Sequence, residues 1–108
     1  MKLVSNFKKL ARKAPIAAGR ALVQTGKDIA SLASQLAPVD TGALRDSYRS
    51  EQVSETTVLV GTDVKYAPYV EYGTSDHEAK PHLTPAFHQS RATFIKNLKR
   101  EIKEAANG

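Results

Sequence analysis

The 108-residue sequence contains no cysteine, and only seven of its side chains are Phe or Tyr. Without cysteine there are neither disulfides nor thiolate metal sites, and the sequence gives no indication of a redox compartment. No apolar run approaches the ~20 residues that a membrane-spanning helix needs, so a membrane is not among the expected partners. A chain of this length predicts a single domain, residues 1–108, with a modest core and little room for a deep enclosed active site.

Acidic residues are missing from the first quarter of the chain. Residues 1–27 carry seven Lys or Arg and no Asp or Glu, residues 28–90 carry four basic and nine acidic side chains, and residues 91–108 carry five and two. Basic ends around an acidic middle indicate either a polyanion partner or complementary contact between copies of the chain. An acid-free start is also typical of transit peptides, but this one has a single Ser before Thr25 and no cleavage pattern, so targeting is the weaker interpretation.

Residues 1–14 predict a basic amphipathic arm or helix. Apolar residues recur at helical spacing and Lys or Arg lie mostly on the opposite side. Pro15 separates this segment from the rest of the chain, and an isolated helix of this length is marginal in water. We therefore expect the arm to become ordered against a neighbouring subunit, using Lys2, Leu3, Phe7, Lys8, Lys9, Leu10, Arg12 and Lys13.

Residues 15–37 predict a long helix that begins at Pro15, since proline is tolerated at the first helical position. Leu22, Gly26, Ile29, Ala33 and Leu36 fall on one face of it. That face is rich in Ala and Gly, so another backbone element can approach it closely. Pro38 ends the helix, because the residue before a proline is pushed out of the helical region.

Residues 38–86 predict a compact sheet-and-turn core, which contains four of the five prolines and all four tyrosines. Asp40 or Thr41 is the expected N-cap of a single turn that runs through Leu44 and Asp46. Two strands are expected to follow as a hairpin, at 48–53 and 57–62, with a turn at 54–56. The second strand is apolar on both faces, so we expect it to be covered on both sides.

The segment 66–72 is ambiguous. Tyr66, Tyr69, Val70 and Gly73 have the spacing of a short helix capped by glycine, but Pro68 would also suit an edge strand; the short helix is favoured.

The last helix is expected over 87–106, with Thr84 as its N-cap and Pro85 opening it. Its longest apolar stripe is predicted to be buried: Phe87, the stem of Arg91, Phe94, Ile95, Leu98 and Ile102. The predicted fold class is α+β, a small antiparallel sheet packed with a long N-terminal and a long C-terminal helix.

Two charges and two glycines suggest specific roles. Arg45 and Glu71 each lie alone among apolar or turn-forming residues, so we expect them to pair, because a partly buried charge needs a partner. Gly42 and Gly73 are expected to be required for backbone reasons.

The sequence offers no catalytic constellation. His77, His82 and His88 lie within twelve residues, but their spacing matches no zinc motif, and solvated loop histidines are the favoured interpretation. No spacing selects a carboxylate pair for acid–base chemistry, and neither a phosphate loop nor a nucleophile elbow is present. The expectation is therefore a protein without enzymatic activity, cofactor or metal.

The tyrosines admit two interpretations. Aromatic rings interleaved with basic residues can stack on single-stranded nucleic acid. Here the neighbours include Asp63 and Glu71 and the region is net acidic, which favours core packing or a protein–protein surface.

Three blocks of sequence carry a resemblance: A-P-V-D-T-G-A-L-R-D-S, V-G-T-D-V-x-Y-A-P-Y-V-E-Y-G-T-S and P-H-L-T-P-A-F. In this order and at this spacing they resemble the neck-protein family of long-tailed bacteriophages, and they cover about half of the chain. His82 stands where an aromatic residue is more usual. The motif residues carried over are Asp40, Thr41, Gly42, Leu44, Arg45, Gly61, Tyr66, Ala67, Tyr69, Val70, Glu71, Gly73, Thr74, Pro81, Leu83 and Pro85.

The resemblance implies a structural protein of the virion, located at the neck or tail top, and in the host cytoplasm during assembly. Family members form a ring, often of six copies, between the adaptor or stopper proteins and the tail tube or tail terminator. Genomic DNA passes through that ring. The alternative from the residues themselves is a small nucleic-acid-binding or regulatory module that uses the basic ends.

Overall fold

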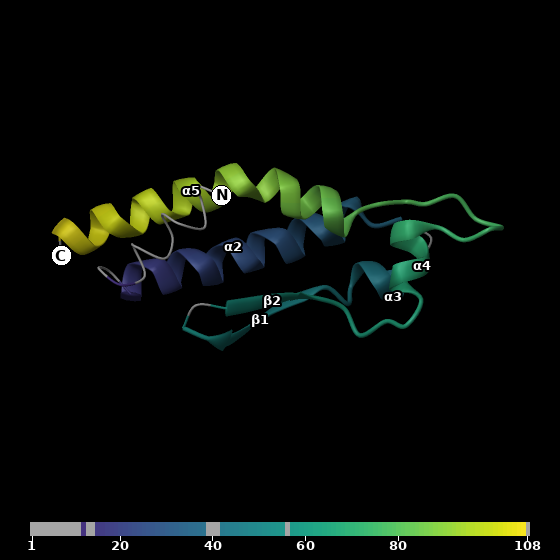
Figure 1. Cartoon of the computed structure of the whole chain (residues 1–108), viewed down its shortest axis with the longest axis horizontal. Helices are drawn as coiled ribbons and strands as arrows, with labels where there is room; N and C mark the ends of the chain where they lie inside the picture. The colour runs from purple at the N-terminus through teal and green to yellow at the C-terminus, as the bar shows by residue number, and fades with distance from the viewer. Residues whose placement is uncertain (1–11, 13–14, 39–41, 56, 108) are drawn as a thin grey trace.

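The structure is a computed structural model that describes residues 12, 15–38, 42–55 and 57–107. The expected α+β class is confirmed: one hairpin is combined with two long helices (Figure 1). Helix α2 lies between α5 on one side and the hairpin on the other, and α5 runs antiparallel to it. The elements are α2 (Pro15–Leu36), α3 (Gly42–Arg45), β1 (Arg49–Ser54), β2 (Thr57–Gly61), α4 (Ala67–Tyr72) and α5 (Leu83–Asn107).

Helix α2 forms the centre of the molecule because its buried side chains are small. It begins at Pro15 and ends at Leu36, just before Ala37-Pro38, as the sequence predicts. A Cβ atom added at Gly26 would lie 2.5 Å from Cγ1 of Val58 in the hairpin. Since real Cβ atoms do not approach so closely, the absence of a side chain at Gly26 allows the hairpin to rest on α2. The expected close approach along the Ala/Gly face is therefore confirmed.

The hairpin is covered on one side only. Strands β1 and β2 pair antiparallel, with Ser50 opposite Val60 and Glu51 opposite Leu59, and a β-bulge lies between Gln52 and Ser54. Val60 packs against the cluster of Ile29, Ala33 and Ala86, whereas the side chain of Leu59 is 58% exposed. The prediction that the second strand is covered on both sides is thus wrong, because α5 packs beside α2 instead of over the outer face of the sheet.

Segment 66–72 folds as the short helix α4, and the edge-strand alternative is wrong. Pro68 lies in its first turn, where the missing N–H costs no helical hydrogen bond. The helix ends at Gly73, with φ 79° and ψ 174°, a combination that is essentially restricted to glycine. The Gly73 amide donates to the carbonyl of Tyr69 at 2.9 Å. The expected glycine end is therefore present, although its ψ is not that of the left-handed helix.

Helix α5 begins at Leu83, so the expected start at Thr84-Pro85 is two residues late. Its buried face consists of small or polar residues: Ala86, Ser90 and Asn97. The Asn97 amide nitrogen donates to Oγ1 of Thr25 at 3.2 Å and to Oδ2 of Asp28 at 3.1 Å. These contacts join α5 to α2 through small side chains and a satisfied polar group.

The apolar stripe predicted to be the buried face of α5 is wrong for most of its residues. Phe87 is 57% exposed, and Arg91, Ile95 and Ile102 are also exposed, while Phe94 and Leu98 are half-buried. The physical reason lies in α2: an Ala-rich face brings the two helix axes close together, and only small residues of α5 fit between them. The larger side chains of α5 consequently remain on its flank.

Candidate interaction surface

Glu71 caps the start of α5, although it lies more than ten residues earlier in the sequence. Its Oε1 accepts hydrogen bonds from the amides of His82 (3.1 Å) and Leu83 (2.9 Å), and its Oε2 accepts one from Thr84 (3.1 Å). Burial raises the pKa of the Glu71 carboxyl, but these donors outweigh burial, so that the pKa lies below its ordinary value. Glu71 therefore supplies the cap that the sequence assigns to Thr84. The predicted pair with Arg45 is wrong, because Arg45 is exposed and Glu71 is buried against these amides.

His82 is fully buried beside Glu71 and is the residue most clearly misjudged from the sequence. Its Nδ1 donates to the carbonyl of Lys80 at 2.9 Å, and its Nε2 bonds to the hydroxyl of Tyr48. The two rings meet edge to face, with centroids 5.3 Å apart. Burial, together with the negative charge of Glu71, raises the pKa of Tyr48 to about 12. The solvated-loop interpretation is wrong for His82, whereas His77 and His88 are exposed.

The other motif residues within the described ranges mostly serve turns. Leu44 is completely buried, and its carbonyl accepts a 2.6 Å hydrogen bond from the hydroxyl of Ser47. The carbonyl of Val70 accepts from the amide of Lys80 at 2.8 Å, and Oγ1 of Thr74 accepts from the amides of Asp76 and His77. We use the name motif region for residues 44–48, α4 and His82.

Some motif residues lie elsewhere. Gly42 and Pro81 are exposed, Leu83 and Pro85 lie in the first turn of α5, and Gly61 ends β2. A Cβ added at Gly42 would meet nothing within 4 Å and its φ is ordinary, so the expected backbone requirement is wrong there. Asp40 and Thr41 lie outside the described residues.

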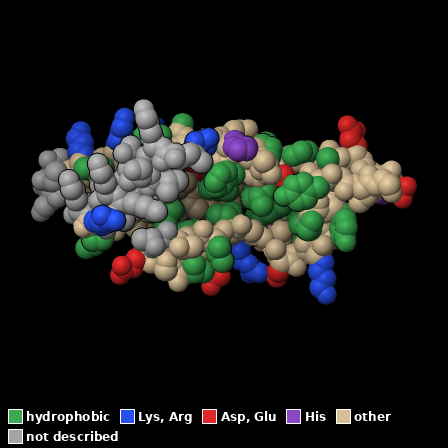
Figure 2. Space-filling model, viewed as in Figure 1, with side chains coloured by type: hydrophobic (Ala, Val, Ile, Leu, Met, Phe, Trp, Pro, Cys, Tyr) green, Lys and Arg blue, Asp and Glu red, His purple; other side chains and the backbone are tan. Residues whose placement is uncertain are grey.

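An apolar groove of about 590 Å³ lies between α5 and β2. Hydrophobic side chains gather over the middle of this face of the molecule, with α5 along one edge and the hairpin along the other (Figure 2). Among the described residues that line it, Arg91 alone is charged. We call this feature the apolar groove; its lining residues are Leu22, Thr25, Gly26, Ile29, Val58, Leu59, Val60, Leu83, Thr84, Phe87, Ser90, Arg91 and Phe94.

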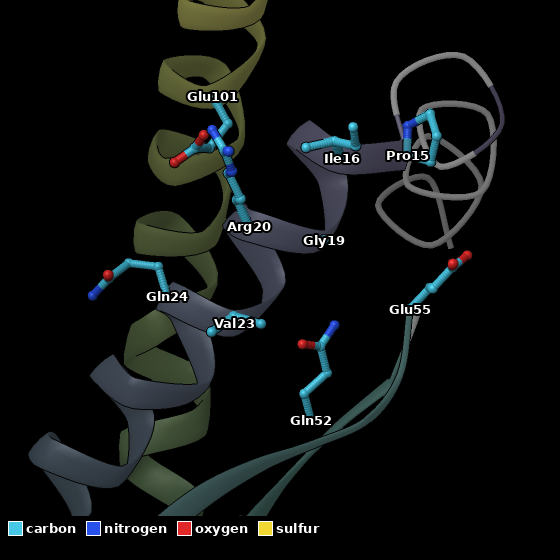
Figure 3. A pocket seen from close by; sticks show the side chains of 9 residues that line it. All are labelled: Pro15, Ile16, Gly19, Arg20, Val23, Gln24, Gln52, Glu55 and Glu101. Carbon is cyan, nitrogen blue, oxygen red and sulfur yellow. The ribbon is translucent and has the colours of Figure 1, made fainter.

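A second hollow of about 570 Å³ lies at the start of α2 (Figure 3). Ile16 and Val23 of α2 contribute apolar surface to it. Glu55 reaches it from the hairpin and Glu101 from α5, and the side chain of Arg20 extends toward Glu101. We call it the acidic hollow, because its lining includes two carboxylates and one cation.

Helix α4 presents the most exposed aromatic side chains of the described residues. Tyr69 is 62% and Tyr72 77% exposed, and Tyr66, which precedes the helix, is also exposed. The sequence favours core packing or a protein–protein surface for the tyrosines. Tyr48 is packed inside, whereas the other three lie at the surface, where a protein–protein contact stays a prediction. Of the eight arm residues, only Arg12 belongs to the described part of the chain, and it is exposed.

Within residues 12, 15–38, 42–55 and 57–107, no group of three or more His, Asp or Glu side chains is placed to hold a metal ion. None of the helices described is long and apolar enough to cross a membrane. In the same part of the chain, every buried side-chain nitrogen or oxygen has a hydrogen-bond partner. The buried polar side chains of the motif region are therefore paired within the chain. A surface that a partner could still cover is the apolar groove.

Comparison with known families shows a match over residues 1–73 of the 108. The matching family is described as "Bacteriophage HK97-gp10, putative tail-component", which places the chain among the structural proteins of bacteriophage tails. The chain belongs to this HK97 gp10-like family. The resemblance to phage neck proteins is confirmed at this level, although the block from Pro81 onward lies beyond the matched residues. No curated protein and no solved structure matches the chain.

Proposed function

We propose that the protein is a structural subunit of the phage virion that forms a ring at the head–tail interface, through which DNA passes. The observation that carries this proposal is the apolar groove, flanked by the exposed Phe87 and Leu59. Contiguous exposed apolar surface on a soluble chain marks an interaction site. Membership of a tail-component family supplies the context in which such a surface has a partner.

The carboxylates support a structural role and not a catalytic one. The best-positioned carboxylate, Glu71, has both oxygens engaged by backbone amides of α5. Asp63 pairs with Arg49 at 2.9 Å on the surface. Glu71 lies 3.3 Å from Nδ1 of His82, but both groups are buried and held by hydrogen bonds within the chain, and Asp63 is exposed, so neither carboxylate is placed at an open cleft as acid–base chemistry would need.

Residues 1–14 are proposed as an assembly arm that docks on a neighbouring subunit. The acidic hollow matches its chemistry, because Glu55 and Glu101 would meet the basic side chains while Ile16 and Val23 would meet Leu3 and Phe7. Each surface ion pair is weak and screened by salt, so several must act with the apolar contacts. Deletion of residues 1–14 should leave the circular dichroism of the remaining helices unchanged and reduce assembly. Normal assembly of the truncated chain would contradict an assembly role.

The proposed function is tested by the mass of the purified chain and by its copy number in assembled particles. A ring subunit should sediment as a closed oligomer, or form one when mixed with the neighbouring adaptor, stopper or tail proteins, and each particle should contain several copies, six if the family's usual ring applies. A monomer or dimer that binds DNA and is missing from particles would instead favour a nucleic-acid-binding module that uses the basic ends.

A further inference from the structure

We infer that the apolar groove receives Tyr69 and Tyr72 of a second copy of the chain. This inference rests on the proposed ring and names the surfaces that would join its subunits. Both surfaces are exposed in one copy and differ from each other, so a single type of contact would use each of them once per subunit.

The groove has the dimensions and chemistry of an aromatic binding site. Its volume of about 590 Å³ falls within the range of ~300–1,000 Å³ found for binding pockets. Its floor is α2, at Leu22 and Ile29, and its two walls are α5 and β2. Because α2 holds both walls, the groove is a fixed feature of the fold and is present before a partner arrives.

The two tyrosines are held in position by their own helix. Tyr69 and Tyr72 are three residues apart, so they project from neighbouring positions on α4. The carbonyl of Tyr69 receives the Gly73 amide, and the carbonyl of Val70 receives the Lys80 amide, which fixes α4 at its end. Tyrosine gives large amphipathic contact area with only two side-chain torsions to fix, which makes it effective in recognition.

The charge of Arg91 favours the tyrosines of α4 over the other apolar segments of this chain as the occupant of the groove. Arg91 stands at the groove, whereas α4 itself contains no cation and its only charged residue is the buried Glu71. The cations nearest to α4 in the sequence, Lys65 and Lys80, lie outside the helix. The guanidinium can lie over a tyrosine ring or donate to its hydroxyl oxygen. The arm of residues 1–14 would bring five Lys or Arg to the same place, and a second α5 would bring its own row of basic residues. Both of these occupants would place more cations beside Arg91 than α4 does.

The placement of the two surfaces defines the kind of assembly. Helix α4 lies toward one end of the elongated molecule (Figure 1). The groove runs along the first half of α5, from Leu83 to Phe94, and along β2. A contact between two different surfaces is heterologous and builds a ring when the rotation between subunits closes. Two tyrosines bury roughly 150–250 Å² each, well below the ~800 Å² per partner of a standard interface. The contact is therefore weak between two free copies and gains strength from ring closure and from other contacts.

The test uses two variants of the full chain and their mixture. In Y69S/Y72S the groove is intact and the tyrosines are missing; in L59R/F87R the tyrosines are intact and two long cations stand at the groove. Circular dichroism and thermal melting establish that each variant folds, and Leu36→Ser, which changes an exposed apolar residue outside both surfaces, is the matched control. Sedimentation velocity at several concentrations then reports self-association.

Each double variant alone should associate more weakly than the parent chain, on the order of thirtyfold, as for loss of a 2 kcal/mol hot spot. The control should associate normally. An equimolar mixture, at a concentration high enough for one contact without ring closure, should form a 1:1 complex, since the tyrosines of L59R/F87R can enter the groove of Y69S/Y72S. Normal assembly of either double variant, or failure of the mixture to form the complex, would overturn the inference. These outcomes are separate from the proposed function, which fails only if the parent chain itself neither assembles nor occurs in several copies per particle.

Discussion

The motif region and the apolar groove divide the molecule into two kinds of surface. In the motif region, Leu44 is completely buried and the Glu71 carboxylate and His82 ring each have hydrogen-bond partners. Around the groove, large apolar side chains such as Phe87 remain more than half exposed. The buried motif residues thus maintain the fold, whereas the surfaces available to partners are the exposed tyrosines of α4 and the groove beside α5.

This difference separates what a mutation should change. Substitutions at the buried residues of the motif region should lower the free energy of unfolding, and substitutions at the groove or at the exposed Tyr69 and Tyr72 should lower association while stability is kept. Four predictions test that division, beginning with the largest expected loss of stability.

Glu71→Ala should destabilise the fold strongly, by about 3 kcal/mol at neutral pH. Its removal leaves three amides at the start of α5 without their acceptor, and each buried unsatisfied donor costs ~1–3 kcal/mol unless water replaces the partner. Urea denaturation gives the value. Glu78→Ala, at an exposed position, is the control and should change stability by less than about 0.5 kcal/mol.

The same carboxylate gives this prediction a pH signature. The pKa of Glu71 in the folded chain lies below its ordinary value of 4.5. Its contribution is therefore complete above that value and is lost as the pH falls through the folded pKa. The difference in stability between the parent chain and Glu71→Ala should shrink in acid, and a difference that stays constant down to low pH would show that the carboxylate charge is not involved.

Gly73→Val should cost about 2 kcal/mol. The backbone there has φ 79°, and an added Cβ would lie 2.8 Å from the amide nitrogen of Ala79 and 3.0 Å from the carbonyl oxygen of His77. Strained backbone conformations cost ~1–3 kcal/mol each, and the backbone contacts cannot relax as a flexible side chain would. The melting temperature of Gly73→Val should be compared with that of Gly42→Ala, which should be unchanged or slightly higher because Gly42 has open space and begins a helix.

Tyr48→Phe should change how the free energy of unfolding depends on pH in the alkaline range. The pKa of Tyr48 is raised from 10.0 to about 12 in the folded chain, so its contribution is complete below pH 10 and is lost as the pH rises toward 12. The parent chain should therefore lose stability over this interval more steeply than the variant. Parallel curves from pH 9 to pH 12 would mean that the hydroxyl ionises as freely in the folded chain as in the unfolded one.

Residues that begin or end helices and strands made much of the fold predictable. Pro15 and Pro38 bracket α2, Gly73 ends α4, and the β-branched run at 57–60 marks β2, so these elements lie within a residue or two of their expected bounds. Each of these signals acts on the backbone of its own residue or a neighbour. Such local effects do not depend on what the rest of the chain does.

The packing of those elements could not be read in the same way. The cap of α5 comes from Glu71, eleven residues before the first amide it binds. The buried His82 bonds to Tyr48, which lies 34 residues earlier in the sequence, before the hairpin. The apolar stripe of α5 indicated the wrong face, because the small side chains of α2 and the acceptors Thr25 and Asp28 favour Asn97 instead. The apolar groove results from that choice, so no single segment of the sequence contains a signal for it.

Phe87→Ala should have the smallest effect on stability and is the sharpest test of the division. Full burial of a Phe side chain is worth ~1.5–3 kcal/mol, and Phe87 is 57% exposed, so the loss should be about 1 kcal/mol or less. Leu44→Ala, at a completely buried position, is the matched apolar truncation in the motif region and should cost ~2–5 kcal/mol. Self-association measured by sedimentation should show the reverse order, with Phe87→Ala impaired and Leu44→Ala normal wherever the latter remains folded. A Phe87→Ala chain that unfolds as readily as Leu44→Ala would mean that the flank of α5 belongs to the core, and that the groove is part of the fold and not a surface for a partner.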